Sequence, residues 1–235
     1  MKMKEKFEML SEWYFKDQLN FDRVLISCRY KTIREFLKSG VGLEMGPGDG
    51  VMTAFLINDF EELDIVEGSK HLLNSIPAYP NVQKYCSLFE NFTPTRQYDT
   101  IVMEHILEHI ENPVEVLKKT KPWLKPNGVV VIGVPNAKSF HRLAAVKMEI
   151  LKSEYALNER DKQLGHYRIY DLDSLRKDIE DAGYHIRHTG GVFFKPVSNK
   201  QIEDSWTPQM IEGFFQLGKD FPENAAEIFV ISTLL

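Results

Sequence analysis

The chain has 235 residues, of which 29 are basic and 34 acidic, giving a formal net charge of −5. No run of Lys and Arg is long enough to follow a phosphate backbone, and no apolar stretch approaches the roughly 20 residues of a membrane-spanning helix, so we expect neither nucleic acid nor membrane as a partner. Cys28 and Cys86 form no CxxC pair, which is typical of a reducing, cytoplasmic location rather than of a disulfide or zinc framework.

Short apolar runs alternate with amphipathic segments, which predicts an α/β fold built from βαβ units. Strands are expected where β-branched and aromatic residues gather between turn signals, at 41–45, 63–67, 82–85, 98–103, 128–134, 184–188 and 228–233. Helical spacing of Leu, Ile and Val predicts helices over 51–58, 113–123 and 172–182. Pro113 suits a first helical turn, Asp171 an N-cap and Gly183 a helix stop.

Two segments fall outside this alternation, although we expect residues 1–235 to form a single domain. Residues 1–38 are predicted to be a folded cap, and residues 135–170 an insert after the fifth strand. Ligands of open α/β sheets bind at the carboxyl edge, so we expect both segments to cover that edge and shape a substrate pocket. The apolar stretch 190–227 leaves two alternatives open, a lid over the pocket or a contact in a homodimer.

The first expected strand runs into a glycine loop that reads Glu44-Met-Gly46-Pro47-Gly48-Asp-Gly50. Glycines permit a tight turn and a close approach of a ligand to the backbone. A dinucleotide loop reads GxGxxG and binds a pyrophosphate, which an acid such as Glu44 would repel. The loop therefore favours a cationic ligand such as S-adenosylmethionine over NAD, and an NAD-dependent oxidoreductase is kept as an alternative.

A second acid, Glu67, ends the second expected strand about 20 residues beyond the loop and is followed by Gly68. An acid at this spacing commonly accepts hydrogen bonds from the two ribose hydroxyls of an adenosyl group. The plain alternative is a solvated acid at a strand end. The spacing favours cofactor binding.

From Val41 to Gly183 the sequence resembles the class I S-adenosylmethionine-dependent methyltransferases. Glu44 to Gly50 is similar to their first motif, Glu67 to their ribose-binding acid, and Tyr85 to Phe89 to the segment beside adenine. Ser87 stands where many members have Asp, which leaves the backbone of Leu88, next to Phe89, as the implied adenine contact. The resemblance implies S-adenosylmethionine as cofactor, S-adenosylhomocysteine as product, and a Rossmann-like doubly wound seven-stranded sheet of order 3-2-1-4-5-7-6 with an antiparallel seventh strand.

Later motifs resemble the ubiquinone-methyltransferase-like branch of this class. They are the LEH-x-x-x-P pattern that ends at Pro113, the run from Lys125 to Asn136, and the segment from His166 to Gly183. The last segment is similar to one found in methyltransferases of sugar and natural-product pathways. The resemblance therefore implies a small-molecule acceptor.

Methyl transfer is an in-line displacement, so the protein must mainly align the acceptor and exclude water. A hydroxyl acceptor also needs a base. Glu104 and His105 follow the fourth strand at the carboxyl edge, and we assign Glu104 to the cofactor and His105 to catalysis as the base, with His141 and His166 of the insert as further candidates. This predicts O-methylation of a sugar or secondary-metabolite intermediate. N-methylation of a small amine or amino sugar, and a scaffold that binds cofactor without turnover, remain alternatives.

Further aromatic and basic side chains are candidates for the wall that binds the acceptor, although each could instead tie the insert or the cap to the core. They are Tyr14, Tyr30, His109, Arg142, Tyr167, Arg168 and Tyr170. The residues Glu104, His105, Glu108 and His109 lack the HExxH order of a zinc protease, so the local spacing predicts no metal.

Overall fold

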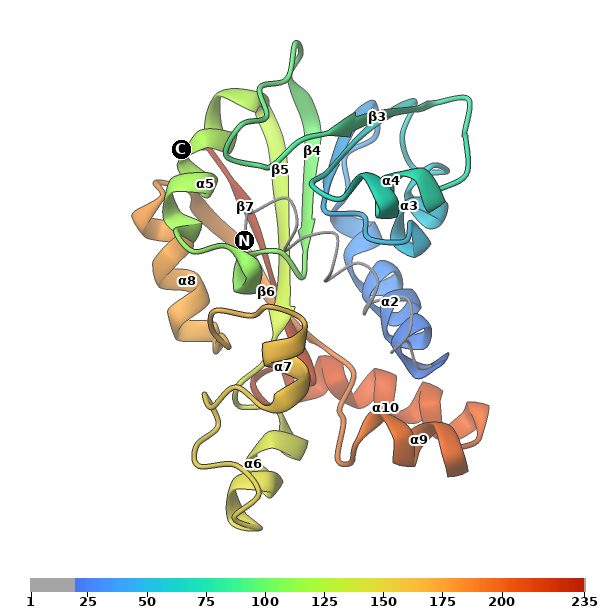
Figure 1. Cartoon of the computed structure of the whole chain (residues 1–235), viewed down its shortest axis with the longest axis vertical. Helices are drawn as coiled ribbons and strands as arrows, with labels where there is room; N and C mark the ends of the chain where they lie inside the picture. Colours follow the sequence, from blue (N-terminus) through green and yellow to red (C-terminus); the bar gives the residue numbers. More distant parts are fainter. Residues whose placement is uncertain (1–19, 235) are drawn as a thin grey trace.

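The apolar runs of the sequence form one sheet in the computed structural model, which describes residues 20–234 (Figure 1). The seven strands are ordered β3-β2-β1-β4-β5-β7-β6, and β7 is antiparallel to both of its neighbours. This confirms the expected fold class and strand order. The strands are β1 (Val41–Met45), β2 (Glu62–Glu67), β3 (Val82–Cys86), β4 (Tyr98–Glu104), β5 (Leu124–Pro135), β6 (His185–Val192) and β7 (Glu227–Thr233).

Two strands are longer than the sequence predicts. β5 begins at Leu124 because this residue pairs with Tyr98, and a register shift after Tyr98 absorbs the Lys-Pro-Asn-Gly turn that follows. β6 continues to Val192 because Gly190 and the next glycine pair with β7. A Cβ at Gly190 would lie 2.5 Å from the ring of Phe229, so the glycine lets the two strands keep their spacing.

Short-range signals mark the ends of the predicted helices at three positions, but the helix predicted over 51–58 ends at Leu56, and the one predicted over 113–123 ends at Thr120 and continues as a 3-10 turn. Pro113 is the first residue of its helix, Asp171 accepts a hydrogen bond from the Ser174 N–H as an N-cap, and Gly183 has φ +80° at a helix end. The helices are α2 (Asn20–Ile33), α3 (Val51–Leu56), α4 (Lys70–Ser75), α5 (Pro113–Thr120), α6 (Phe140–Lys147), α7 (Glu159–Gln163), α8 (Leu172–Asp181), α9 (Asn199–Ser205) and α10 (Pro208–Asp220). Short 3-10 turns span Arg34–Phe36, Leu107–His109, Lys121–Trp123 and Pro222–Asn224.

Helices cover both faces of the sheet (Figure 1). On one face α5 and α8 bury Leu117 and Ile179 against the strands, and on the other α2, α3 and α10 bury Phe21, Leu56 and Phe215. Burial of these apolar side chains supplies the main driving force for the fold. In the part of the chain that the structure describes, no helix has the length and apolarity needed to cross a membrane.

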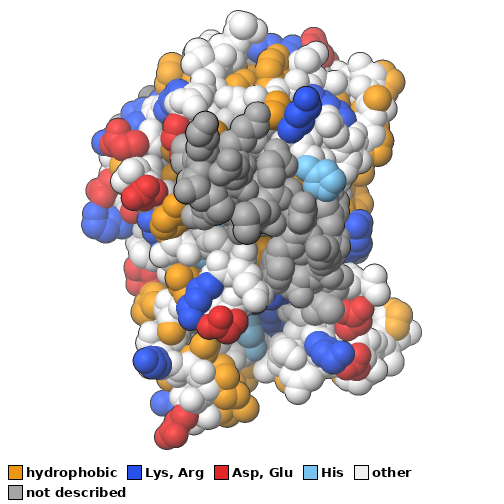
Figure 2. All heavy atoms as spheres, viewed as in Figure 1, with side chains coloured by type: hydrophobic (Ala, Val, Ile, Leu, Met, Phe, Trp, Pro, Cys, Tyr) orange, Lys and Arg blue, Asp and Glu red, His pale blue; other side chains and the backbone are white. Residues whose placement is uncertain are grey.

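Helices α6 and α7 of the insert, together with α9 and α10, extend beyond the lower end of the sheet in Figure 1. The insert, with α6 and α7, lies on one side there, and α9 and α10 lie on the other. In the space-filling view these two groups form separate lobes at the lower end of the molecule (Figure 2). Acidic and basic side chains are interspersed over the described part of this face.

Candidate active site

A cleft of about 400 Å³ opens at the carboxyl edge of the sheet. Such a volume is in the range of small-molecule sites. Its walls come from the β1 loop, the ends of β2 and β4, helix α2, the insert and the chain segment before β7. The carboxyl ends of parallel strands meet here, which is where open α/β sheets bind ligands.

The glycine loop forms one wall of the cleft. Gly46 has φ +69°, and a Cβ at this position would collide with the side chain of Ile106. Only glycine fits both the backbone conformation and the close approach. Of the predicted cofactor residues, the structure places Glu44, Gly46, Pro47, Gly48, Glu67, Phe89 and Glu104 in the lining.

The other predicted cofactor residues do not line the cleft. Gly50 instead precedes α3 with φ +83° and packs against Ile76. Ser87 donates its hydroxyl to its neighbour's carbonyl at 3.0 Å and its N–H to the Glu67 carbonyl at 3.0 Å, so its side chain is committed to the backbone. Gly68 and Leu88 are likewise absent from the lining of the described cleft.

Glu67 is fixed by the start of helix α4. Its Oε1 accepts the N–H of Ser69 at 2.8 Å, and the Ser69 hydroxyl in turn caps α4 by accepting the N–H of Leu72. These contacts hold the carboxylate at the end of β2 on the cleft surface. That is the position of a ribose-binding acid in nucleotide-binding α/β folds.

Glu44 lies under the glycine loop and is 3% exposed. The hydroxyl of Thr53 donates to its Oε2 at 2.6 Å. Burial raises the pKa of Glu44 to about 8, and the negative charge of Glu67 adds to the rise. A cation bound at this wall would oppose both effects and restore the ionised form.

Glu104, at the end of β4, is a second buried acid in the lining. Its side chain occupies the space that a Cβ on Gly133 would need. Among the described residues neither carboxyl oxygen has a hydrogen-bond partner, and the Arg29 Nε lies 3.6 Å from Oε2. Burial raises its pKa to about 8, although Arg29 opposes the rise. The group can therefore accept or donate a hydrogen bond to a ligand near neutral pH.

His105 adopts φ +56°, a conformation that costs energy for a residue with a Cβ and occurs often at functional sites. Its N–H donates to the Gly133 carbonyl at 2.8 Å. The Nε2 lies 3.1 Å from Oε1 of Glu227 but makes no hydrogen bond, and Nδ1 lies 3.6 Å from Oε1 of Glu108. Burial lowers the pKa of His105, so the ring is neutral at pH 7 and can accept a proton.

Arg29 and Glu227 form a buried ion pair beside His105. The Arg29 Nε donates to Oε2 at 2.7 Å and the terminal nitrogen to Oε1 at 3.1 Å. Burial alone would raise the pKa of Glu227, but the neighbouring Arg29 guanidinium lowers it to about 2. Glu227 is therefore ionised and would stabilise an imidazolium on His105.

Neither member of this ion pair was predicted from the sequence. For Glu227 a signal was present, because an acid directly precedes the strand predicted at 228–233. An antiparallel strand begins at the edge where its parallel neighbours end. Arg29 had no comparable signal, since its position depends on how α2 packs across the sheet.

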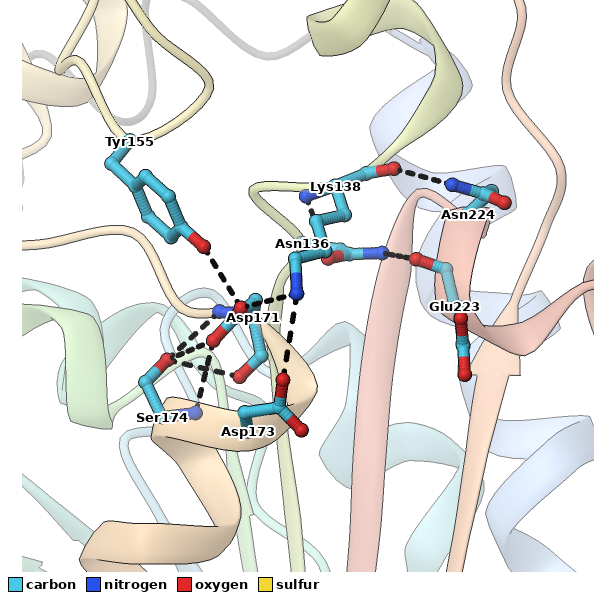
Figure 3. A network of polar contacts seen from close by, with 8 residues as sticks. All are labelled: Asn136, Lys138, Tyr155, Asp171, Asp173, Ser174, Glu223 and Asn224. Atoms are coloured by element: carbon cyan, nitrogen blue, oxygen red, sulfur yellow. Dashed lines mark hydrogen bonds and ion pairs between the residues drawn. The ribbon is translucent and has the colours of Figure 1, made fainter.

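A polar network fastens the insert to the rest of the molecule (Figure 3). The Asn136 amide donates to the carbonyls of Glu223 at 2.8 Å and Ala225 at 2.9 Å. The Lys138 Nζ lies 2.8 Å from Asp171, which also accepts the Tyr155 hydroxyl at 2.8 Å. The insert is thereby joined to both α8 and the turn before β7.

The insert contributes two of the predicted bases to the cleft, His141 and His166. Burial lowers the pKa of His141 to about 2 and that of His166 to about 3. Arg142 also lines the cleft, but its guanidinium donates to the Glu154 carbonyl at 2.9 Å and to Asp161 at 3.2 Å. These contacts commit the cation to holding the insert together.

Four of the predicted acceptor residues do not line the cleft. Tyr30 donates its hydroxyl to Asp59 at 2.7 Å, and Tyr170 donates to Asp178 at 2.7 Å. The other two are Arg168, whose guanidinium donates to backbone carbonyls, and Tyr167, which is 47% exposed. Tyr14 lies outside the described residues, whereas His109 does line the cleft.

The stretch 190–227 supplies another wall of the cleft, through Lys195, Asn199, Ala226 and Glu227. The Lys195 Nζ donates to the Asn199 side chain at 2.7 Å, and burial lowers the pKa of Lys195 to about 8. Of the two alternatives for this stretch, the structure therefore places it at the pocket. The homodimer stays a prediction.

Comparisons with known proteins agree with this geometry. A family described as a methyltransferase domain matches residues 23–189, which is more than half of the chain. A ubiquinone biosynthesis O-methyltransferase of Rickettsia canadensis is 22% identical over 214 residues, covering 83% of this chain and 88% of the relative. A malonyl-[acyl-carrier protein] O-methyltransferase of Halalkalibacterium halodurans is 27% identical over 111 residues, which is 43% of this chain and only 41% of that protein.

A solved structure shows the same fold. The N-methyltransferase NodS of Bradyrhizobium japonicum, in complex with S-adenosylhomocysteine, superposes with a TM-score of 0.60 at 11% identity, covering 97% of this chain and 98% of that chain. The cleft fits the cofactor of this class, because a glycine loop that has no room for a Cβ adjoins Glu67 and the buried Glu44. The chain belongs to the methyltransferase-domain family and is a class I S-adenosylmethionine-dependent methyltransferase.

Proposed function

We propose that this enzyme methylates a hydroxyl oxygen of a small molecule, such as a sugar or a secondary-metabolite intermediate, with His105 as the base. The observation that carries the proposal is the position of His105 on the cleft surface beside the ionised Glu227. A hydroxyl must lose its proton near the transition state, and a neutral imidazole can accept it. Glu227 then stabilises the cation that forms.

The cofactor supplies an activated methyl group on a sulfonium, and the protein residues supply position and proton transfer. In this proposal Glu67 binds the ribose hydroxyls, and Glu44 with the loop glycines holds the charged amino-acid end. Burial lowers the pKa of His141 to about 2 and that of His166 to about 3, so both rings are poor bases, and His141 binds the acceptor by a hydrogen bond. The insert and the Lys195 wall exclude water.

N-methylation of a small amine or amino sugar is a second candidate, and one observation favours it. The two carboxyl oxygens of Glu104 have no hydrogen-bond partner and lie in the cleft lining, where an amine N–H could donate to them. A neutral amine attacks without a base. This function would make His105 dispensable for the chemical step.

Matched acceptor pairs separate the two functions. Each pair consists of a hydroxyl compound and its amino analogue, a sugar with its amino sugar or a phenol with its aniline, incubated with methyl-deuterated cofactor. Mass spectrometry of fragments locates the label. Transfer to oxygen that is lost in His105→Ala supports the proposal, whereas transfer to nitrogen that survives the substitution establishes the second candidate.

We also propose the cytoplasm as the location, since Cys28 and Cys86 are free thiols.

A further inference from the structure

Glu108, His109 and His166 bring three ligand atoms to one point at the wall of the cleft. One side-chain oxygen of Glu108 and one ring nitrogen of each histidine all lie within 4.8 Å of one another. The first two residues belong to the 3-10 turn after β4, and the third comes from the insert. The Glu108 carboxylate has no role in methyl transfer as proposed above.

The carboxyl group of Glu108 is buried without a hydrogen bond from the described residues, and its nearest printed contact is the His105 Nδ1 at 3.6 Å from Oε1. The side chain is 0% exposed, and neither oxygen makes a hydrogen bond to any described residue. Removing a carboxyl from water without replacing its hydrogen bonds is costly, so a buried acid is normally paired with a donor or a metal.

His166, which comes from the insert, also has a buried polar atom that makes no hydrogen bond to a described residue. Its side chain is 5% exposed, and its Nδ1 has no hydrogen-bond partner. The ring packs edge-on against His109, with centroids 4.6 Å apart and an interplanar angle of 90°. Both histidines line the cleft, so a group bound between them and Glu108 would have the cavity on its remaining side.

Backbone and side-chain hydrogen bonds hold the two segments in this arrangement. The Tyr167 N–H donates to the carbonyl of Glu108 at 2.7 Å. Arg168 donates to the carbonyls of Ile110 at 2.7 Å and Glu111 at 2.8 Å. The insert is therefore fastened to the turn directly beside the cluster, which gives Arg168 a positioning role in place of the predicted acceptor contact.

We propose that Glu108, His109 and His166 bind a divalent transition-metal ion of the Zn²⁺ type at the wall of the acceptor cleft. Two imidazoles and one carboxylate suit first-row transition metals, whereas Mg²⁺ and Ca²⁺ prefer oxygen ligands. Three protein ligands with the cavity on the fourth side match the ligand count of a catalytic rather than a structural site. An ion here would bind and acidify an acceptor hydroxyl, a role that rests on the proposed O-methylation.

The local sequence does not predict this site. Glu108 and His109 alone lack a recognised ligand spacing, and His166 reaches them only because the insert folds back onto the turn. The prediction of no metal rested on the spacing of residues that are close together in the sequence. The fold brings in His166 as the third ligand, although it is distant from Glu108 and His109 in the sequence.

Metal binding can be measured without any acceptor. The full chain is stripped with a chelator, dialysed, and titrated calorimetrically with Zn²⁺, Mn²⁺ and Mg²⁺, and Co²⁺ absorption reports the ligand set. We expect one Zn²⁺ per chain, bound more tightly than Mg²⁺. Changes outside the ligand shell of metal sites typically cost 10- to 100-fold, so Glu108→Gln and His166→Phe, which remove ligands, should weaken Zn²⁺ binding by more than about 100-fold.

Controls separate loss of the site from loss of the fold. His185→Ala removes an exposed histidine of β6 and should leave Zn²⁺ affinity unchanged. His109→Phe keeps a ring against His166 while removing a ligand, and each variant must bind S-adenosylhomocysteine like the native chain. Zn²⁺ that fails to bind the native chain, binds no better than Mg²⁺, or binds equally to the ligand variants would overturn the site. The regiochemistry of methyl transfer is measured separately, so either proposal can fail alone.

Discussion

The Nε2 atom of His105 lies 3.1 Å from Oε1 of Glu227, the first residue of β7. The contact joins the end of a parallel strand to the start of the antiparallel one. It places an ionised carboxylate beside a neutral base in a cleft that also holds most of the predicted cofactor residues. Several measurable consequences come from this arrangement.

Replacing His105 with Ala should lower kcat by about 10²- to 10⁴-fold, the usual contribution of a positioned general base. Affinity for S-adenosylhomocysteine should change little, because the predicted cofactor contacts lie on the glycine loop and Glu67. Steady-state kinetics and calorimetry measure the two quantities. His185→Ala serves as a matched control on the exposed part of β6. An unchanged kcat would assign His105 a structural role.

With S-adenosylmethionine saturating at every pH, the pH dependence of kcat/KM for the acceptor should show an acid limb with an apparent pKa below 6.5. The base acts in its neutral form, and burial lowers the pKa of His105 from 6.5, so more acid is needed to inactivate the enzyme. Removing the negative charge in Glu227→Gln should move this limb to still lower pH. A limb above 6.5 in the native enzyme would contradict the assignment.

Glu67→Ala should weaken S-adenosylhomocysteine binding by about 1 to 3 kcal/mol through the lost ribose hydrogen bonds. The change is measured by calorimetric titration at constant pH. Glu61→Ala, which removes an exposed acid just before the same strand, is the control and should bind normally. Equal affinity in both variants would exclude Glu67 from the cofactor site.

Binding of S-adenosylmethionine should release protons at pH 7. The pKa of Glu44 is raised to about 8 by burial, so the group is largely protonated before a cationic ligand arrives and ionises beside it. Affinity should therefore rise with pH and level off above about 8. Titrations in buffers of different ionisation enthalpy count the protons. Glu44→Gln should release fewer, and an equal count would point to Glu104 as the source.

Glu227→Gln should lower the free energy of unfolding by about 3 to 5 kcal/mol, because it leaves Arg29 buried without its ionic partner. The folded-state pKa of Glu227 is about 2 against an ordinary 4.5, so the stabilisation is present above pH 4.5 and lost as pH falls toward 2. Urea unfolding at several pH values should show the two proteins converge in acid. Glu115→Gln, at an exposed ion pair, should unfold like the native chain.

Much of the fold could be predicted from local pattern. Alternating apolar runs located all seven strands, and Pro113, Asp171 and Gly183 marked the helix ends. The strand order came from the resemblance, since pattern alone does not determine which strands pair. The ends of β5 and β6 were missed because they depend on pairing with Tyr98 and β7 rather than on propensity.

The site residues could be predicted from the sequence only where they stand at or next to the end of a strand. Glu44, Glu67 and His105 stand at or next to strand ends, so their place in the sequence determines their place at the edge. For the other candidates, the hydrogen bonds that their side chains make in the fold determine whether they reach the cleft. Tyr30 was expected at the acceptor but donates to Asp59 instead.

The cleft has two parts, which bind their ligands in different ways. The part predicted for the cofactor uses backbone shape at Gly46 and a few acids at strand ends, whereas the opposite part uses side chains of the insert and of the segment that holds Lys195. Loops on a rigid scaffold tolerate replacement better than the scaffold itself. New acceptors can therefore be acquired by exchanging the second part alone, and transplanting residues 135–170 between relatives becomes a direct way to redirect the methyl group.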